Sequence, residues 1–412
     1  MRLIHTSDWH LGHSLHRHSR HAEHEAFLQW LLQALRDQAA DALLIAGDIF
    51  DTVNPSAQAQ QQWYRFLAQA RRSCPDLDII VIGGNRDSAA RLAPPPPLLA
   101  ELAVQALGGV RRVDGAPDPK AMVVSITDAQ GHPAGQVAAV PFLRLADVPK
   151  VDSEEDPAVA GVRELYRQTL EYIREHKQPQ EAIIAMGHCY MSGTAISELS
   201  ERKVFGGNQH ALPVDLFGPD VAYVALGHLH LAQRVGADHV RYCGSPIPLS
   251  LPERTYPHQV LVVDFEGAAL SAITPIRVPR TVDLLRVPAS GSEDLTTVLA
   301  KLAALPVALP DDTHREAWPF LEVHVRLPEP QPALAAEIGE VLADRRVRLA
   351  RLATHYTGTG DTLGTDVAPD LSALRPEEVF LRCWNSTFQS DPEPALIECF
   401  HELLDQVRQE AR

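Results

Sequence analysis

Short runs of apolar residues, separated by amphipathic segments, recur along the first two thirds of the chain. Apolar runs of this length, bounded by turn-forming residues, are typical of buried strands. We therefore expect strands at residues 2–6, 43–46, 79–82, 121–127, 136–140, 182–186, 221–226 and 260–265. Such strands, with helices between several of them, indicate an α/β fold.

The segments between several of these strands have apolar side chains at helical spacing. Residues 21–37 repeat leucine and phenylalanine every three or four positions, and residues 158–176 form a longer amphipathic segment. Pro55 and Ser56 begin another expected helix. Four consecutive prolines at residues 94–97 cannot continue a helix, but residues 98–107 are expected to form one after them.

A second pattern starts at about residue 279. Expected strands at residues 281–287, 320–327 and 347–352 are interspersed with expected helices at residues 292–305 and 332–342. This order predicts a small α+β domain over residues 279–355, after a larger domain over residues 1–278.

The end of the chain is expected to be a linker and a helix pair. Gly358, Gly360 and Gly364 favour a flexible linker over residues 356–371. Residues 372–412 contain two short segments with wide apolar stripes, which are too small for a core of their own. They are expected to dock either on the preceding domain or on a partner protein, and the glycine linker favours the partner.

Polar residues follow the expected strands of the larger domain. Asp, Asn and His side chains at the carboxyl ends of strands lie where open α/β sheets bind ligands. Each residue alone is more often a turn, a cap or a surface side chain, so their recurrence after strands is what indicates a site. The candidates are Asp8, His10, Asp48, Asn85, His188, His228 and His230.

These residue types suit two divalent metal ions. Hydrolysis of a phosphodiester needs an activated water and positive charge beside the phosphate, and a pair of metal ions supplies both. Mixed His, Asp and Asn ligands match manganese or a similar ion. Asp48 is expected to bridge the two ions. The remaining ligands are assigned as Asp8, His10 and His230 for one ion, and Asn85, His188 and His228 for the other.

The motifs resemble those of known metallophosphoesterases. Residues 8–10, 47–48, 84–87, 187–188 and 227–230 are similar to the signature of the calcineurin-like family. The longer segments 5–12, 46–52, 225–230 and 242–250 resemble the bacterial SbcD family, the nuclease subunits of SbcC-SbcD complexes. This resemblance implies a β-sandwich flanked by helices, followed by an α+β domain that caps the DNA and by a C-terminal helix pair.

The resemblance also implies an activity and partners. It implies an exonuclease and endonuclease that uses two Mn²⁺ or Mg²⁺ ions on double-stranded DNA ends and hairpins. Residues 372–412 would bind SbcC, an ABC-type ATPase, and two copies of this chain would form a homodimer within a heterotetramer. The chain has no glycine-rich phosphate-binding loop of its own, so ATP would act through SbcC.

Arg86 departs from the family pattern. The family has a histidine between Asn85 and Asp87, where it acts near the scissile phosphate, and Asp87 is expected to support it. Arginine stays protonated at neutral pH and cannot exchange a proton, so low activity is expected. Arg86 is either an engineered inactivating substitution or a natural variant compensated by a nearby histidine such as His13.

Composition limits the alternatives. The formal net charge of −16 excludes a chain that is basic throughout, although His13, Arg17 and Arg20 are candidates for contacts with DNA. Five scattered cysteines suit a reducing compartment, and no apolar run is long enough to span a membrane. A cytoplasmic protein is therefore expected, and the resemblance implies that it is associated with the nucleoid. A small-molecule phosphatase or phosphodiesterase of the same fold, and a non-catalytic scaffold for the ATPase, remain alternatives.

Overall fold

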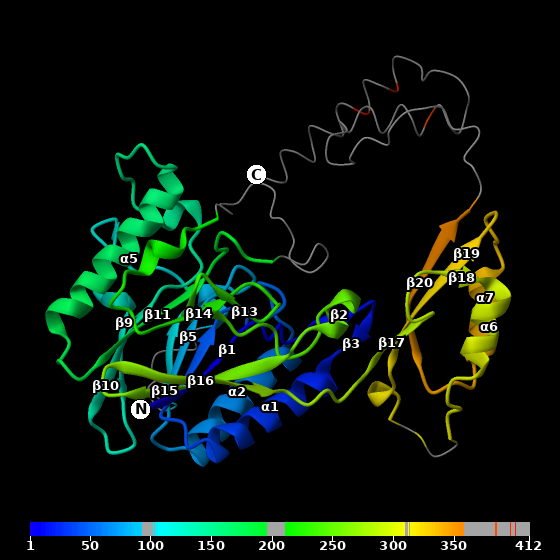
Figure 1. The fold of residues 1–412 in the computed structure, drawn as a ribbon, viewed down its shortest axis with the longest axis horizontal. Helices are drawn as coiled ribbons and strands as arrows, with labels where there is room; N and C mark the ends of the chain where they lie inside the picture. Colours follow the sequence, from blue (N-terminus) through cyan, green and yellow to red (C-terminus); the bar gives the residue numbers. More distant parts are fainter. Residues whose placement is uncertain are drawn as a thin grey trace. The chain divides into compact units, whose positions relative to one another are not determined.

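Two six-stranded sheets pack against each other in the larger part of the chain (Figure 1). This computed structural model describes residues 1–92, 102, 104–195, 211–309, 312, 314–357, 384, 396 and 400. The first sheet has the order β16 (Ala269–Arg277), β15 (Gln259–Glu266), β1 (Arg2–Thr6), β4 (Ala42–Ala46), β5 (Asp78–Ile82) and β6 (Val104–Leu107). The second has the order β13 (Gln233–Val235), β14 (Ala237–Tyr242), β12 (Tyr223–Gly227), β11 (Ala182–His188), β10 (Pro133–Ala139) and β9 (Val123–Thr127).

Parallel pairing in the middle of each sheet aligns the strand ends. In the first sheet β1, β4, β5 and β6 are parallel neighbours. In the second sheet β10, β11, β12 and β14 are parallel neighbours. The carboxyl ends of these strands therefore lie along one edge of each sheet, as the position of the predicted site requires.

Helices cover the outer faces of both sheets. The helices α1 (His21–Asp37) and α2 (Ala57–Ser73) pack on the first sheet, and α5 (Pro157–His176) packs on the second (Figure 1). Ser56 caps α2 by accepting a hydrogen bond from the backbone N–H of Ala59 at 3.2 Å. Asp156 caps α5 in the same way, directly before a proline at its first position. The helix-sheet-sheet-helix layering confirms the predicted β-sandwich flanked by helices.

Burial on both faces explains the continuous apolar strands. In β4, Leu43 and Ile45 face the cluster under α1 and α2, whereas Leu44 and Ala46 face the space between the sheets. Because neighbouring residues of a strand point to opposite faces, a strand covered on both sides has apolar residues at every position.

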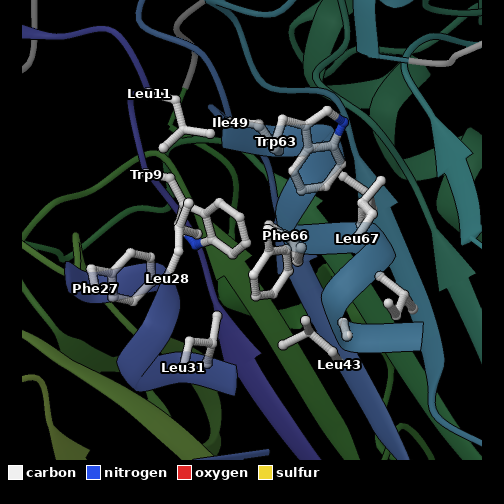
Figure 2. Close-up of a cluster of buried hydrophobic side chains, with 14 of the residues drawn as sticks. Trp9, Leu11, Phe27, Leu28, Leu31, Leu43, Ile49, Trp63, Phe66 and Leu67 are labelled. Carbon is white, nitrogen blue, oxygen red and sulfur yellow. The ribbon is translucent and has the colours of Figure 1, made fainter. Parts of the chain in front are cut away.

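Aromatic side chains fill the space between α1, α2 and the first sheet. The indole of Trp9 has no exposed surface and makes edge-to-face contacts with Phe27, Trp63 and Phe66, with ring centroids 5.5, 5.7 and 5.2 Å away (Figure 2). Its Nε1–H donates a hydrogen bond to Oγ1 of Thr6 at 2.9 Å. The loop after β1 is thereby anchored in the core.

The part of the chain after about residue 279 forms a four-stranded sheet. It consists of β17 (Leu284–Val287), β19 (Phe320–Leu327), β18 (Glu293–Asp294) and β20 (Arg348–Tyr356). The helices α6 (Leu295–Ala303) and α7 (Leu334–Leu342) cover one face and form a separate apolar cluster with it. Residues Met1–His355 form one compact unit, and the boundary proposed at residue 279 stays a prediction. The predicted linker over 356–371 and helix pair over 372–412 lie almost entirely outside the described residues.

Most predicted elements have counterparts, but one predicted helix is partly wrong and several strands were not predicted. The helix expected at residues 98–107 is wrong for its second half, because residues 104–107 form β6 and pair with β5 in the first sheet. Strands β13, β14 and β16 were not predicted. The remaining elements are short: β2 (Ser14–Leu15), β3 (His18–Ser19), α3 (Ala89–Leu92), β7 (Arg112–Val113), β8 (Ala116–Pro117), and the 3₁₀ helices η1 (Pro119–Met122), η2 (Leu145–Asp147), η3 (Val214–Phe217), η4 (Leu251–Thr255) and η5 (Arg315–Ala317). No helix in the described ranges is long and apolar enough to cross a membrane.

Candidate metal centre

The predicted ligands come from the carboxyl ends of strands in both sheets. The first sheet contributes the segments after β1, β4 and β5, and the second contributes the end of β11 and the segment after β12. Although they are far apart in the sequence, the structure brings the predicted ligands into one cluster: Asp8, His10, Asp48, Asn85, His188, His228 and His230.

Two glycines let the sheets approach each other beside this cluster. A side-chain carbon at Gly227 would lie 1.9 Å from the carbonyl oxygen of Ala46, and one at Gly47 would lie 2.3 Å from Nδ1 of His188. Both distances are far shorter than a van der Waals contact. A larger residue directly before Asp48 or His228 would therefore clash with the opposite sheet. Glycine at these two positions lets ligands from the two sheets come together.

Three side chains form the first group. One ligand atom from each of Asp8, His10 and His230 lies within 4.8 Å of the others, and all three residues are buried. Nε2 of His10 is buried, has no hydrogen-bond partner among the described residues, and lies 3.5 Å from Oδ2 of Asp48. A buried imidazole nitrogen without a partner is costly, and a cation beside this carboxylate would satisfy it.

A second group shares Asp8 and adds Asp48 and His188, again with ligand atoms within 4.8 Å. Nε2 of His188 lies 3.5 Å from Oδ1 of Asp48, and the other oxygen of Asp48 faces His10. Asp48 therefore lies between the two groups, which is the position that a bridging carboxylate needs. Asp8 belongs to both groups, whereas the sequence pattern placed it with one ion only.

Asn85 joins the second group through its amide oxygen. Its Oδ1 lies 3.0 Å from Nε2 of His188 and 3.1 Å from Nδ1 of His228. Nδ1 of His188 lies 2.8 Å from the carbonyl oxygen of Ala46, so a proton on Nδ1 leaves the lone pair of Nε2 directed at two oxygens. Oxygen and nitrogen lone pairs that converge in this way repel one another unless a proton or a metal ion lies between them.

Four of the clustered residues have left-handed backbone conformations. Asp8, His10, Asp48 and His228 have φ values of 54°, 49°, 51° and 101°. Only a few per cent of residues other than glycine adopt such values, and they concentrate at functional sites. This strain is consistent with loops shaped to direct side chains at a common point.

Comparison with known proteins agrees with this geometry. The family model described as "Calcineurin-like phosphoesterase" matches residues 1–232, and that described as "Type 5 capsule protein repressor C-terminal domain" matches residues 280–388. The chain is 39% identical over 387 residues to the SbcD subunit of the nuclease SbcCD from Rhodobacter capsulatus, and the alignment covers 92% of this chain and 93% of the relative. This chain belongs to the SbcD family of calcineurin-like phosphoesterases.

Two further relatives have lower identity to this chain. The Escherichia coli K12 protein of the same name is 30% identical over 390 residues, covering 93% of this chain and 92% of the relative. The Bacillus subtilis protein is 33% identical over 272 residues, covering 64% of this chain and 66% of the relative. Membership in the SbcD family confirms the predicted family, the metallophosphoesterase fold and the enzyme class, a metal-dependent nuclease.

Asp87 supports the cluster without belonging to it. Its buried carboxylate accepts hydrogen bonds from the backbone N–H groups of Gly84, Ile49 and Phe50, at 2.9, 3.1 and 3.0 Å. These bonds join the loop that carries Asn85 to the loop that follows Asp48. Burial, together with the charge of Asp48, raises the pKa of Asp87 to about 6.

Two carboxylates beside the cluster were missed in the sequence. Oδ1 of Asp51 lies 3.1 Å from Nδ1 of His10, and Oε1 of Glu253 lies 3.0 Å from Nδ1 of His230. Metal-binding histidines in proteins commonly donate their second N–H to such a carboxylate. Asp51 lies within the quoted segment 46–52 and could have been recognised, but nothing in the sequence connects Glu253 with His230.

Charges in the cluster influence one another strongly. Burial alone would raise the pKa of Asp48, but the His188 and His10 rings hold it below its usual value. Burial opposes a charge on His188, yet the carboxylate of Asp48 raises the pKa of His188 to about 9. Burial and the charged His188 lower the pKa of His228 to about 3. A metal ion bound where these lone pairs converge would compete with a proton on His188.

Arg86 lies beside the cluster, and its side chain is directed at Asp51. Its backbone N–H donates to Oδ1 of Asp48 at 2.9 Å. Its guanidinium donates to the carbonyl oxygen of Asp51 at 3.3 Å and lies 3.6 Å from that residue's carboxylate. The side chain is partly exposed, so it can also meet a ligand that approaches the cluster.

One suggested DNA contact is wrong. Arg20 is completely buried, where its guanidinium pairs with Glu23 and donates to the carbonyl oxygen of Pro248 at 2.6 Å. It also lies over the ring of Phe320, 5.2 Å from the centroid. Arg20 is thus held inside the protein by its partners, whereas Arg17 is exposed.

Proposed function

We propose that this chain is the nuclease subunit of an ATP-dependent complex that processes double-stranded DNA ends and hairpins. The observation that carries the proposal is the convergence of His, Asp and Asn side chains from both sheets around Asp48. The relatives are called subunits of the nuclease SbcCD, which supports a DNA substrate over a small phosphodiester.

The cluster would hold two divalent ions, Mn²⁺ or Mg²⁺. Asp8, His10 and His230 would bind one, Asn85, His188 and His228 the other, and Asp48 would bridge them. When bound, such an ion pair activates a water and neutralises charge on the phosphate. The side chains of this chain would fix where the ions lie, and the carboxylates of Asp51 and Glu253 would orient two of the histidines.

The rest of the chain would supply DNA and partner contacts. We propose that residues 279–355 cap the DNA and that residues 372–412 bind the coiled-coil base of an SbcC-type ATPase, through which ATP acts. Two copies of the chain would pair within a heterotetramer, in the cytoplasm at the nucleoid. The family model that matches residues 280–388 begins one residue after the proposed start of the DNA-capping domain, which supports that boundary.

We further propose that Arg86 weakens cleavage. Arginine cannot exchange a proton near neutral pH, and its guanidinium is paired with Asp51 here. Burial lowers the pKa of His13 to about 3, which disfavours the protonated ring that a general acid needs, so His13 would not replace the missing histidine. The protein would then bind metal and DNA but cleave the DNA slowly.

Removing divalent ions is expected to lower the thermal unfolding temperature of the full chain. Ions that bind only the folded state stabilise it, by about 2.7 kcal/mol at a concentration of about 100 Kd. Thermal unfolding in EDTA and in Mn²⁺ measures the difference. The Asp264→Asn variant should retain the whole shift, since Asp264 pairs with Arg2 in a strand away from the cluster. Equal unfolding temperatures for the wild type in EDTA and Mn²⁺ would contradict a metal site.

The activity itself is tested with DNA and a competing substrate. The full chain, with and without its reconstituted ATPase partner, is incubated with blunt and hairpin DNA in Mn²⁺, and in parallel with a chromogenic phosphodiester. Cleavage of DNA that increases with the partner and ATP supports the proposal. Hydrolysis of the small diester with no cleavage of DNA would instead support a small-molecule phosphodiesterase.

A further inference from the structure

Glu253 is a buried carboxylate with a full set of partners beside the cluster. It has no exposed surface. Its Oε1 lies 3.0 Å from Nδ1 of His230 and accepts from Oγ of Ser250 at 2.9 Å. Its Oε2 accepts from the backbone N–H of Leu249 at 2.8 Å. The carboxylate therefore has one orientation, and so does the imidazole that it faces.

This contact determines which nitrogen of His230 carries the proton. A carboxylate can only accept hydrogen bonds, so Nδ1 of His230 donates to Glu253 and the proton stays on Nδ1. In a neutral ring, Nε2 then keeps its lone pair, which is the form that binds a metal. Glu253 is thus a positioning residue, because it acts on the site through His230.

The segment that carries Glu253 also packs against the four-stranded sheet of the α+β region (residues 279–355). We call residues 250–255 the coupling segment; they comprise Ser250 and the 3₁₀ helix η4. Leu251 is buried in a small apolar cluster with Leu15, Val282, Leu284 and Phe320. Because Leu284 and Phe320 belong to β17 and β19, the coupling segment contacts the α+β region two positions before Glu253.

A polar contact fixes the other side of the segment. Nη1 of Arg254 lies 3.8 Å from Oε2 of Glu322 on β19, and the backbone oxygen of Arg254 accepts from Nη2 of Arg280 at 2.7 Å. Leu251 and Arg254 thus flank Glu253 and both face the α+β region. Beside this junction is a groove of about 530 Å³, lined in part by Thr255, so the junction is not closely packed throughout.

We propose that the coupling segment links the position of the α+β region to the orientation of His230 through Glu253. A shift of β17 and β19 would move Leu251 and Arg254, and Glu253 between them would lose its alignment with His230. Metal affinity at the position served by Asp8, His10 and His230 would then depend on how the α+β region is seated. This inference rests on the proposed metal site, but it concerns its control, which the proposed function does not describe.

Glu253→Gln tests the first step. Whichever way the amide turns, its NH₂ group faces either the N–H of Leu249 or His230, and in the second case it draws the His230 proton to Nε2. Loss of such a partner of a metal-binding histidine typically lowers metal affinity about 10- to 100-fold. Mn²⁺ binding to the full chain, followed by calorimetry and electron paramagnetic resonance, should show this loss at one of two sites. Equal loss at both sites, or none, would overturn the proposal.

Leu251→Ala tests the link to the α+β region. This substitution does not change the Glu253 and His230 side chains, but it removes the side chain that packs on Leu284 and Phe320. Changes along a coupled network typically alter affinity by about 2- to 30-fold, and we expect a loss in this range at the same single site. The matched control is Ile338→Ala, which removes a buried side chain from the cluster under α6 and α7, away from the coupling segment. Its metal affinity should equal that of the wild type.

The outcomes separate this inference from the proposed function. A wild type that binds no Mn²⁺ would refute the metal site itself. A wild type that binds two ions, with Leu251→Ala and Ile338→Ala both indistinguishable from it, would refute the coupling and leave the metal site intact. Equal losses in Leu251→Ala and Ile338→Ala would assign the effect to general destabilisation and would also refute the coupling. Thermal unfolding of each variant without metal verifies that it folds.

Discussion

Replacing Arg86 by histidine is expected to raise the rate of Mn²⁺-dependent DNA-end cleavage by about 10²- to 10⁴-fold. This is the range that a general acid or base contributes, and it is absent while a permanently protonated guanidinium occupies the position. In the structure the guanidinium is held at Asp51, next to His10. A histidine at the same backbone position lies on the loop that Asp87 fixes against the loop after Asp48. The measurement is a single-turnover cleavage assay of both proteins on blunt DNA.

Two further variants determine what the histidine supplies. Arg86→Gln removes the positive charge without adding a proton donor, so it should remain as slow as the parent. His13→Gln in the parent should leave the slow rate unchanged, because the His13 ring is neutral. Equal rates for the parent and Arg86→His would refute the role given to this position, and a loss of residual cleavage in His13→Gln would show that His13 compensates.

Trp9→Ala is expected to lower the free energy of unfolding by about 3–5 kcal/mol. The indole is completely buried between Phe27, Trp63 and Phe66, so its removal leaves a large cavity under α1 and α2 (Figure 2). Because Trp9 lies between Asp8 and His10, the variant should lose Mn²⁺ affinity as well. Urea unfolding and Mn²⁺ titration measure the two effects.

A smaller aromatic substitution separates packing from hydrogen bonding. Trp9→Phe keeps most of the aromatic contacts but loses the hydrogen bond to Thr6, which typically contributes about 0.5–1.5 kcal/mol. Its destabilisation should therefore be well below that of Trp9→Ala. A Trp9→Ala protein with unchanged urea midpoint and unchanged Mn²⁺ affinity would show that the loop after β1 does not depend on this anchor.

Local sequence patterns predicted most of the fold. A helix makes its backbone hydrogen bonds within itself, and a strand covered on both faces is a continuous run of apolar residues. Strand β4 is covered on both sides and is therefore apolar at every position, and α1 has a helical stripe that ends where the helix ends. Residues 104–107 were assigned wrongly because their partner is β5, more than twenty positions earlier. Strand β16 has mainly exposed side chains and no apolar run, so only its pairing with β15 defines it.

The same difference between local patterns and contacts of distant residues applies to the site. The predicted ligands could be named because glycine precedes Asp48, His188 and His228 at the ends of strands, and the structure gives a steric reason for Gly47 and Gly227. Glu253 could not be named, because its relation to His230 depends on how the chain returns from β14 through residues 243–250. A contact made by two side chains across a folded loop has no local periodicity and no fixed spacing in the sequence.

The position of β1 in the first sheet has a consequence for the growing polypeptide on the ribosome. Strand β1 pairs on one side with β4, which follows soon after it, but on the other side with β15, where Leu3 is opposite Val263. A ribosome adds about 5–20 residues per second, so roughly 13 to 52 s pass between the two strands of that pair. During this interval nascent chains expose an unpaired edge of an apolar strand, which is the kind of surface that promotes aggregation and that chaperones cover.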